Sequence, residues 1–351
     1  MAPTSQYLSS ADLKAVNDGG LIREDVMDQI WDISKIPLPY TDLVGSDSCD
    51  NAYFEWTTDK LSDPEIGGWV VDGADSDKND SSTGARLGNH CGILDKEVQV
   101  TGRARASDTI GRGDELSYQV MMRQRELRRN VEANALGIQG SQEDDGDATP
   151  GIPAGLAAMV TQFDTGSGAA GGGFAAKAWT EITPGARVPL TETMVRDAQQ
   201  DAYLDGADPT VLMSVPGVIR KLSEYMFTSS SRIATLTRET QGITGGGSAT
   251  AVGSVNVFIT DFGQTLTFRD NRIQQIYEDS AAAAAAAVFL LDPAYARITF
   301  LRGYRVNPLA KTGDADKRQM LVDWSNRVMN PDAHRVLLDI DPTAAVTFDG
   351  A

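Results

Sequence analysis

One long helix constrains the fold of this chain more than any other feature of its sequence. Residues 113–136, GDELSYQVMMRQRELRRNVEANAL, place apolar side chains at steps of four and seven, which is the spacing of a single helix face. Acidic residues occupy the expected first turn, where they complement the helix dipole, and Gly137 follows as a stop signal. At ~1.5 Å per residue this helix is roughly 35 Å long. Its apolar stripe is predicted to consist of Leu116, Val120, Leu127, Val131 and Ala135.

The same helix concentrates positive charge in an acidic protein. The formal net charge of the chain is −18, yet residues 123–129, RQRELRR, contain four arginines. Residues 1–100 carry a net charge of −12, whereas residues 101–140 carry +2. Like charges three and four positions apart on a helix repel, so either water solvates this face or an anionic partner lies against it. That partner is either nucleic acid or the acidic side chains of a neighbouring copy. The residues concerned are Arg123, Arg125, Arg128 and Arg129, with Glu126 and Glu132 able to relieve part of the repulsion.

The first hundred residues predict an arm followed by an extended hairpin. Residues 21–33 have helical spacing, and this helix should end before Pro37. Within residues 51–107, the segments YFEWTTDKL and EVQVTGRARA alternate like strands on either side of a long polar tip. A hairpin of this kind buries little of itself, so it must lie across another surface or remain mobile. We expect it to pack mainly against another subunit, with Trp56 and Trp69 in the contact.

The rest of the chain alternates between helix and strand signals, which indicates an α+β fold. Residues 141–185 are rich in Gly, Ala and Asp and predict a flexible insertion with little core. A helix with Thr191 as its N-cap, a short buried strand and a second helix beginning at Pro216 follow. From Val252 onward the pattern is mainly β, and RQMLVDWSNRVMN is favoured as a strand because its neighbours are strands. The alanine run at 281–287 does not decide between a helix turn and a close-packed segment.

No set of residues in the sequence predicts catalysis, a cofactor or a metal site. His90 and His334 are the two histidines, and no nucleophile motif or paired-cysteine motif is present. His90 and Cys91 are adjacent, but structural zinc takes four ligands, so the two alone do not predict zinc binding. Two cysteines in a chain of 351 residues fit a reducing compartment. The lack of a long apolar run argues against a membrane span.

An acidic calcium-binding surface or interaction module is the alternative function that the composition leaves open. The segment DSDKNDSSTGAR resembles a calcium loop at Asp75, Asp77 and Asn79. However, Asp80 stands where such loops need glycine, and Arg86 stands where they need a bidentate glutamate. A solvated loop tip is therefore the preferred interpretation. A hydrolase without a recognisable motif is a further alternative, which a monomer that turns over substrate would support.

The order of these segments resembles the major capsid protein of tailed double-stranded DNA phages, which has the Hong Kong 97-type fold. Each segment alone is moderately specific, whereas their order and spacing together are specific and cover nearly the whole chain. The segments that carry the resemblance are GDELSYQVMMRQRELRRNVEANAL, PTVLMSVPGVIRKLSEYM, VFITDFGQTLTFRDNRI and VFLLDPAYARITFLRGYRVNPLAKTGDADKRQMLVDWSNRVMNPDAH. The implied α+β fold has an N-terminal arm at 1–50, an extended loop at 51–107, a peripheral domain with a spine helix at 108–140, an axial domain at 141–250 that includes the insertion at 141–185, and a β-rich return to both domains at 251–351.

The resemblance also implies a structural function and no enzymatic one. Copies of the chain would form hexamers and pentamers in an icosahedral shell around packaged DNA, without sequence-specific contacts to that DNA. The implied partners are a scaffold protein, a portal protein and decoration proteins, with no cofactor and no membrane. Assembly would take place in the cytoplasm of the bacterial host, and the product would be the head of the virion. In such a shell the acidic arm and loop would meet the arginines of residues 123–129 across subunit boundaries.

Some relatives in this family join a lysine of one chain to an asparagine of another. Lys60, Lys78 and Lys96 in the loop, with Asn326 and Asn330 near the C-terminus, supply those residue types. The reaction also needs a carboxylate held in a dry site, which this sequence does not indicate. We therefore expect no covalent crosslink between subunits.

Overall fold

The computed structural model describes residues 37–343, apart from several gaps. The helix expected over residues 21–33 lies outside the described residues. So do Lys60, Lys78 and the centre of the calcium-like segment, which includes Asp77, Asn79 and Asp80. The gaps are residues 60, 62–63, 65, 68, 74, 76–83, 108–112, 162–178, 227–256, 260–261, 264 and 312.

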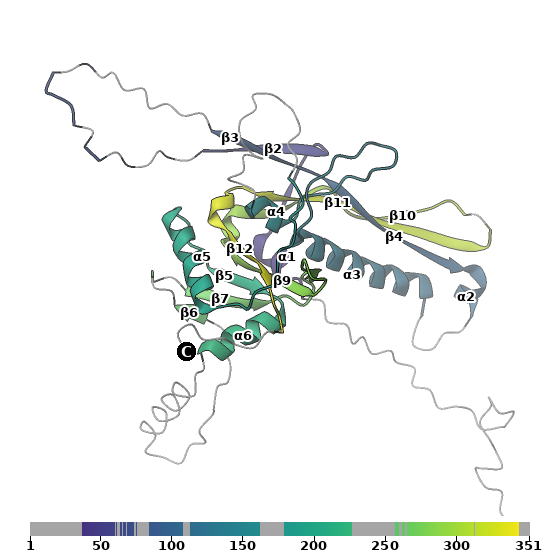
Figure 1. Cartoon of the computed structure of the whole chain (residues 1–351). Helices are drawn as coiled ribbons and strands as arrows, with labels where there is room; N and C mark the ends of the chain where they lie inside the picture. The colour runs from purple at the N-terminus through teal and green to yellow at the C-terminus, as the bar shows by residue number, and fades with distance from the viewer. Residues whose placement is uncertain are drawn as a thin grey trace, which may run out of the picture.

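Two mixed sheets form the body of the molecule (Figure 1). The first has the strand order β1-β10-β11-β4, and the second has the order β12-β9-β5-β7-β6 with β8 beside β9. A separate hairpin pairs β2 with β3. Strands that follow residue 251 enter both sheets. The bounds of the first sheet are β1 Ser46–Ser48, β4 Gly92–Thr101, β10 Ala296–Pro308 and β11 Ala315–Val328. Those of the second are β5 Val211–Ser214, β6 Val257–Ile259, β7 Thr265–Asp270, β8 Tyr277–Glu278, β9 Ala284–Leu291 and β12 Arg335–Ile340.

The long helix α3, Glu115–Ala135, confirms the element predicted over residues 113–136. It runs along the four-stranded sheet and packs against β4 and β11 (Figure 1). Leu127, Val131 and Ala135 are at most 1% exposed, and Val120 is partly buried. Burying a Leu or Val side chain contributes about 1.5–3 kcal/mol, so the predicted apolar stripe is what holds α3 to the sheet.

Helices α5 (Glu192–Leu204) and α6 (Pro216–Met226) pack on the six-stranded sheet at the predicted positions. Thr191 Oγ1 accepts a hydrogen bond from the Met194 amide at 3.3 Å, which confirms Thr191 as the N-cap of α5. Strand β5 is buried along its whole length because it lies between β7 and β9. Helix α4 (Leu156–Thr161) contacts β11 of one sheet and β12 of the other, so it joins the two halves of the body.

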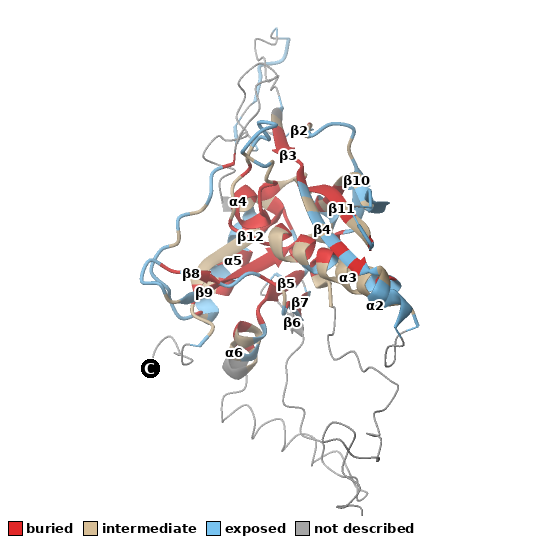
Figure 2. Ribbon diagram, turned by 90° about the vertical axis from the view of Figure 1, so that its right-hand side faces the viewer, coloured by how far each residue is buried: buried red, intermediate tan, exposed pale blue. Residues whose placement is uncertain are grey.

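Burial is concentrated where the sheets, α3 and α4 meet, and the short helix α2 lies at an exposed end of the molecule (Figure 2). The short elements are α1 Pro39–Val44, α2 Gly102–Ala106, and the 3-10 turns η3 Pro293–Tyr295 and η4 Pro331–Ala333. Tyr40 and Val44 of α1 are buried in the same cluster as the stripe of α3. The described end of the N-terminal arm is therefore part of the core.

The predicted pairing within residues 51–107 is wrong. Strand β2, Tyr53–Thr58, pairs with β3, Ala85–His90, in a register that sets Tyr53 opposite His90. Strand β4, which contains EVQVT, pairs instead with β11, and the GRARA that follows is helix α2. The reason is burial: the side chains of Val98 and Val100 face the common core, where they gain more than they would in an isolated hairpin.

The prediction of little core in residues 141–185 is wrong for the part of this segment that the structure describes. Leu156 and Met159 are 0% exposed, and the Trp179 indole nitrogen donates to the Gly88 carbonyl at 2.8 Å. Small residues permit this close packing: a Cβ at Gly155 would lie 2.0 Å from the Gly137 carbonyl oxygen. In this part of the segment, the small side chains that suggested flexibility are therefore what allows the backbone segments to pack closely.

The two ambiguous C-terminal segments are both strands. RQMLVDWSNRV lies in β11, as predicted, and Trp324 in it is 1% exposed. The alanine run enters strand β9 at Ala284 after a turn in which Ala282 has a positive φ of 56°. Ala285, Ala286 and Ala287 are at most 2% exposed, so the run is the close-packed segment.

Candidate inter-subunit surfaces

The four arginines of the cluster on α3 differ in exposure and in partners. Arg128 and Arg129 are exposed, whereas Arg123 and Arg125 are half-buried. Arg123 forms an ion pair with Glu126 one turn away, as expected for a side chain that relieves the repulsion. Lys96 of β4 reaches the same carboxylate, with its Nζ 4.0 Å from Glu126 Oε2. Part of the positive charge is therefore neutralised within the chain.

The two exposed arginines, Arg128 and Arg129, also differ in the partners that they have within the chain. The guanidinium carbon of Arg128 lies 5.4 Å from the centre of the Tyr304 ring on β10, within cation–π range. Burial raises the pKa of Tyr304 to about 12, and the charge of Arg128 partly opposes that rise. Arg129 forms no ion pair or hydrogen bond with any residue that the structure describes. Arg129 is thus the member of the cluster most available to another molecule.

Glu132 does not relieve the arginine repulsion, which corrects the second half of that expectation. Its side chain is 0% exposed, and its hydrogen-bond donors belong to α1 and to the loop after β7. Glu132 Oε1 accepts from the Tyr40 amide at 2.8 Å and from Asn271 Nδ2 at 2.8 Å. Glu132 Oε2 accepts from the Thr41 amide at 2.8 Å and from the Thr41 hydroxyl at 2.5 Å. One carboxylate thus joins α1, α3 and the loop after β7.

The two tryptophans of the loop lie in opposite environments. Trp56 on β2 is half-buried, and its indole nitrogen donates to the Val328 carbonyl at 2.9 Å. Trp69 is 93% exposed, in the loop between β2 and β3. That loop leaves the body beyond the β2–β3 hairpin (Figure 1). Its described residues expose five large apolar side chains, namely Leu61, Ile66, Trp69, Val70 and Val71.

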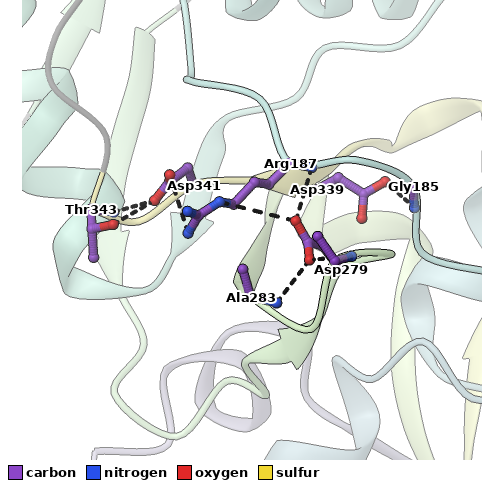
Figure 3. A network of polar contacts seen from close by, with 8 residues as sticks. Gly185, Arg187, Asp279, Ala283, Asp339, Asp341 and Thr343 are labelled. Atoms are coloured by element: carbon purple, nitrogen blue, oxygen red, sulfur yellow. Dashed lines mark hydrogen bonds and ion pairs between the residues drawn. The ribbon is translucent and has the colours of Figure 1, made fainter.

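Arg187, an exposed arginine on the segment before α5, forms ion pairs within its own chain (Figure 3). Arg187 Nη1 lies 3.4 Å from Asp341 Oδ2, and its Nε lies 4.0 Å from Asp279 Oδ2. Asp279 also accepts backbone hydrogen bonds from Ala281 and Ala283, each at 2.8 Å. These bonds, first that from Ala283, lower the pKa of Asp279, so the carboxylate stabilises the fold at neutral pH and loses that effect as the pH falls. The network ties residues 185–188 to the second sheet.

Both histidines, His90 and His334, are buried. His334 is 0% exposed, and burial lowers its pKa to about 4, so it stays neutral. His90 is also buried, with its ring centre 4.7 Å from that of Tyr53. Within the described ranges, no group of three or more His, Cys, Asp or Glu side chains is placed to hold a metal ion. No helix in the described part of the chain is long and apolar enough to cross a membrane.

Comparison with known proteins decides the family. The sequence matches one family, described as SU10 major capsid protein, over residues 4–341. The chain belongs to the SU10 major capsid protein family. A curated relative, the major capsid protein of Escherichia phage Phieco32, is 29% identical over 101 residues. That match spans 29% of this chain and 29% of the relative, so it supports the family locally.

Solved capsid structures share the fold of this SU10-family chain. The capsid of Cyanophage P-SCSP1u is 13% identical with a TM-score of 0.53, over 96% of this chain and 99% of that one. The capsid of Cyanophage A-1(L) is 13% identical with a TM-score of 0.55, over 91% of this chain and 97% of that one. The Hong Kong 97-type α+β fold expected from the sequence is therefore confirmed. The inter-subunit roles of Arg123, Arg125, Arg128, Arg129, Trp56 and Trp69 stay predictions.

Proposed function

We propose that copies of this SU10-family chain assemble, as hexamers and pentamers, into the icosahedral shell of a tailed-phage head that encloses double-stranded DNA. The observation that carries the proposal is a capsid fold over nearly the whole chain, combined with a loop whose apolar side chains its own body leaves uncovered. Exposed apolar groups gathered on one segment mark an interaction surface. A second copy supplies the missing cover.

The two sheets correspond to the two domains of such a subunit. The four-stranded sheet with α3 forms the peripheral domain, and the six-stranded sheet with α5 and α6 forms the axial domain near the centre of the capsomer. Because β10 and β11 belong to one sheet and β9 and β12 to the other, the C-terminal third of the chain links both domains. This link supports rigid subunits that meet through the loop and the arginines of α3.

Scaffold, portal and decoration proteins are the further partners that this function requires, with assembly in the bacterial cytoplasm. The formal net charge of −18 opposes adhesion to the phosphate backbone, which needs Lys and Arg to replace counterions. Packaged DNA would therefore lie beside the shell without sequence-specific contacts. The candidate loop of the alternative function, a calcium-binding module, lies mostly outside the described residues.

Electron microscopy of the purified protein tests the proposal. The full chain is produced alone and together with its candidate scaffold protein, concentrated, and examined in negative stain. We expect closed shells of uniform diameter in at least one of the two preparations. A protein that stays monomeric in both preparations at high concentration would contradict the shell-forming function.

The arginine face is expected to serve assembly and not DNA binding. Residues 112–137 carry five arginines and four acidic residues, a net charge too small for strong phosphate binding. Replacing both Arg125 and Arg129 with glutamate should reduce shell yield severalfold while the monomer stays folded, because charge complementarity fixes the register between subunits. The Arg125→Lys/Arg129→Lys variant, which keeps the charge, is the matched control. Normal shell yield with loss of packaged DNA alone would show that the cluster faces the genome.

Shells of this protein are expected to lack covalent crosslinks. Asn326 is 0% exposed, and its amide donates to the carbonyls of Ala135 and Ala154 at 2.9 and 3.1 Å. The Asn330 side chain accepts from the Asp332 amide at 3.2 Å. Particles boiled in detergent should therefore release one band near 37.6 kDa. A ladder of higher masses that survives boiling would disprove this expectation.

A further inference from the structure

We propose that Cys49 and Cys91 form a reversible disulfide within one chain, which closes the base of the projecting loop. Their Sγ atoms lie 3.6 Å apart although the residues are far apart in sequence. Cys49 follows β1, and Cys91 stands between β3 and β4, so the pair brackets the β2–β3 hairpin and its loop. Both cysteines are in the thiol form. This modification site is independent of shell assembly.

The backbone on both sides holds the two thiols together. The Cys49 amide donates to the Phe300 carbonyl at 3.2 Å, which fixes it to β10. The Cys91 amide donates to the Ala52 carbonyl at 2.7 Å, which fixes it to the start of the hairpin. A disulfide needs its sulfurs at about 2.05 Å. Closing the remaining gap takes a side-chain shift of roughly 1.5 Å, and the anchored backbone stays in place.

The bond would turn residues 49–91 into a covalent ring. That ring contains the whole loop, including the exposed Trp69, and its root is the four-stranded sheet. A crosslink stabilises chiefly by restricting the unfolded chain, and the effect grows with the length of the enclosed segment. After a single cut in the loop, the oxidised form would thus keep the chain on both sides of the cut attached to the four-stranded sheet.

Cys49 is the attacking thiol and Cys91 the resolving one. Cys49 is half-buried and open to a small oxidant, whereas Cys91 is 7% exposed. Burial is the main cause that raises the pKa of both thiols, and the neighbouring Asp323 acts in the same direction. For Cys49 alone, Arg327 partly opposes the rise. Because the pKa values of both thiols are raised, little thiolate exists at neutral pH. The pair therefore oxidises slowly and needs long exposure to an oxidant.

A small-molecule disulfide such as glutathione disulfide is the oxidant, and the reaction is balanced by exchange. The Cys49 thiol loses its proton to water, and its sulfur attacks one glutathione sulfur and releases the first glutathione thiolate. Cys91 then loses its proton, attacks Cys49 Sγ and releases the second. The two thiolates take up the two protons. Two protein thiols are oxidised to one disulfide, and one glutathione disulfide is reduced to two glutathione molecules. The cytoplasm opposes this reaction, and an oxidising exterior favours it.

Intact mass spectrometry of the reduced full-length protein tests the pair, after treatment with glutathione disulfide at about pH 8.5 to raise the thiolate fraction. We expect the wild type to lose two hydrogen atoms and retain no glutathione. Cys91→Ser should stop at one glutathione adduct on Cys49. Cys49→Ser should remain largely unmodified. A wild type that accumulates one or two stable glutathione adducts, or forms disulfide-linked dimers, would overturn the proposal.

Proteolysis gives a second readout that depends on connectivity alone. Lys60 and Lys78 provide trypsin sites inside the ring. After oxidation and a cut at either site, the fragments that carry Cys49 and Cys91 should stay joined on a gel without reductant and separate when reductant is added. Cuts at both sites also release residues 61–78. The Cys49→Ser protein, cut in the same way, should separate in both gels. Fragments of the oxidised wild type that separate without reductant would contradict the closed ring.

Discussion

Replacing Glu132 with alanine is expected to lower the free energy of unfolding by at least about 3 kcal/mol. The carboxylate is 0% exposed and accepts hydrogen bonds from two backbone amides of α1 and from two side chains. Removing it leaves those donors buried without an acceptor, and each unsatisfied buried donor costs about 1–3 kcal/mol. The loss also separates α1 from α3 and from the loop after β7, so we expect no shells from this variant.

Urea denaturation of the purified monomer, followed by circular dichroism, measures this effect. Glu126→Ala is the matched control, since Glu126 is a glutamate on the same helix and its carboxylate forms an ion pair with Arg123. Its side chain is 34% exposed, and exposed pairs contribute at most about 1 kcal/mol. Glu132→Gln should fall between the two, because an amide can accept on one side only. Equal destabilisation by Glu126→Ala and Glu132→Ala would show that burial of this carboxylate is not what holds α1.

Helix α3 could be predicted from the sequence, but the role of Glu132 could not. Apolar spacing over twenty residues leaves one arrangement for α3, since a single stripe must face the core. Glu132 stands next to Val131 of that stripe, yet its charge favoured a place on the solvated side. The groups that make its burial possible belong to Tyr40, Thr41 and Asn271, which lie 92, 91 and 139 residues away. No local pattern reports on partners at such separations.

Strand pairing is the second feature that could not be predicted from the sequence. The alternation in EVQVT indicates that one face of the strand is buried, but it does not indicate which strand lies beside it. The pairing of β4 with β11 joins residues more than two hundred positions apart. Strand β3 carries the sequence ARLGNH, whose Gly and polar residues resemble a loop, although Leu87 is 1% exposed. The loop was therefore predicted in the right place with the wrong strand at its base.

Segments of small residues were interpreted incorrectly for a related reason. Gly and Ala are frequent both in flexible linkers and where backbones approach closely. In residues 154–159 the second explanation holds, because Leu156 and Met159 fill the junction between the sheets. Composition gives the size of the side chains. Whether a segment of small side chains is a flexible linker or a closely packed one depends on the elements that lie beside it.

Replacing Trp69 with alanine is expected to reduce shell yield by at least about tenfold, since a buried interface tryptophan contributes about 2 kcal/mol or more per contact. Trp69 is 93% exposed in its own chain and stands with Val70 and Val71, which are 71% and 80% exposed. If the loop crosses a neighbouring subunit, this tryptophan is the largest side chain that it brings. The monomer loses no contact of its own, so its unfolding midpoint should not change.

Trp56→Ala is the matched control, because it should have the opposite pattern. Trp56 packs against the common core, and its indole nitrogen donates to the Val328 carbonyl at 2.9 Å. Its removal should destabilise the monomer by about 2–4 kcal/mol, which urea denaturation measures, so a fall in shell yield should come with a lower unfolding midpoint. Shell yield is counted by sedimentation and electron microscopy for both variants and for Trp69→Phe, which keeps an aromatic ring and should assemble. If Trp69→Ala assembles as well as the wild type, the loop tip does not form the contact between subunits, and the covering of its apolar side chains has to be sought in another partner.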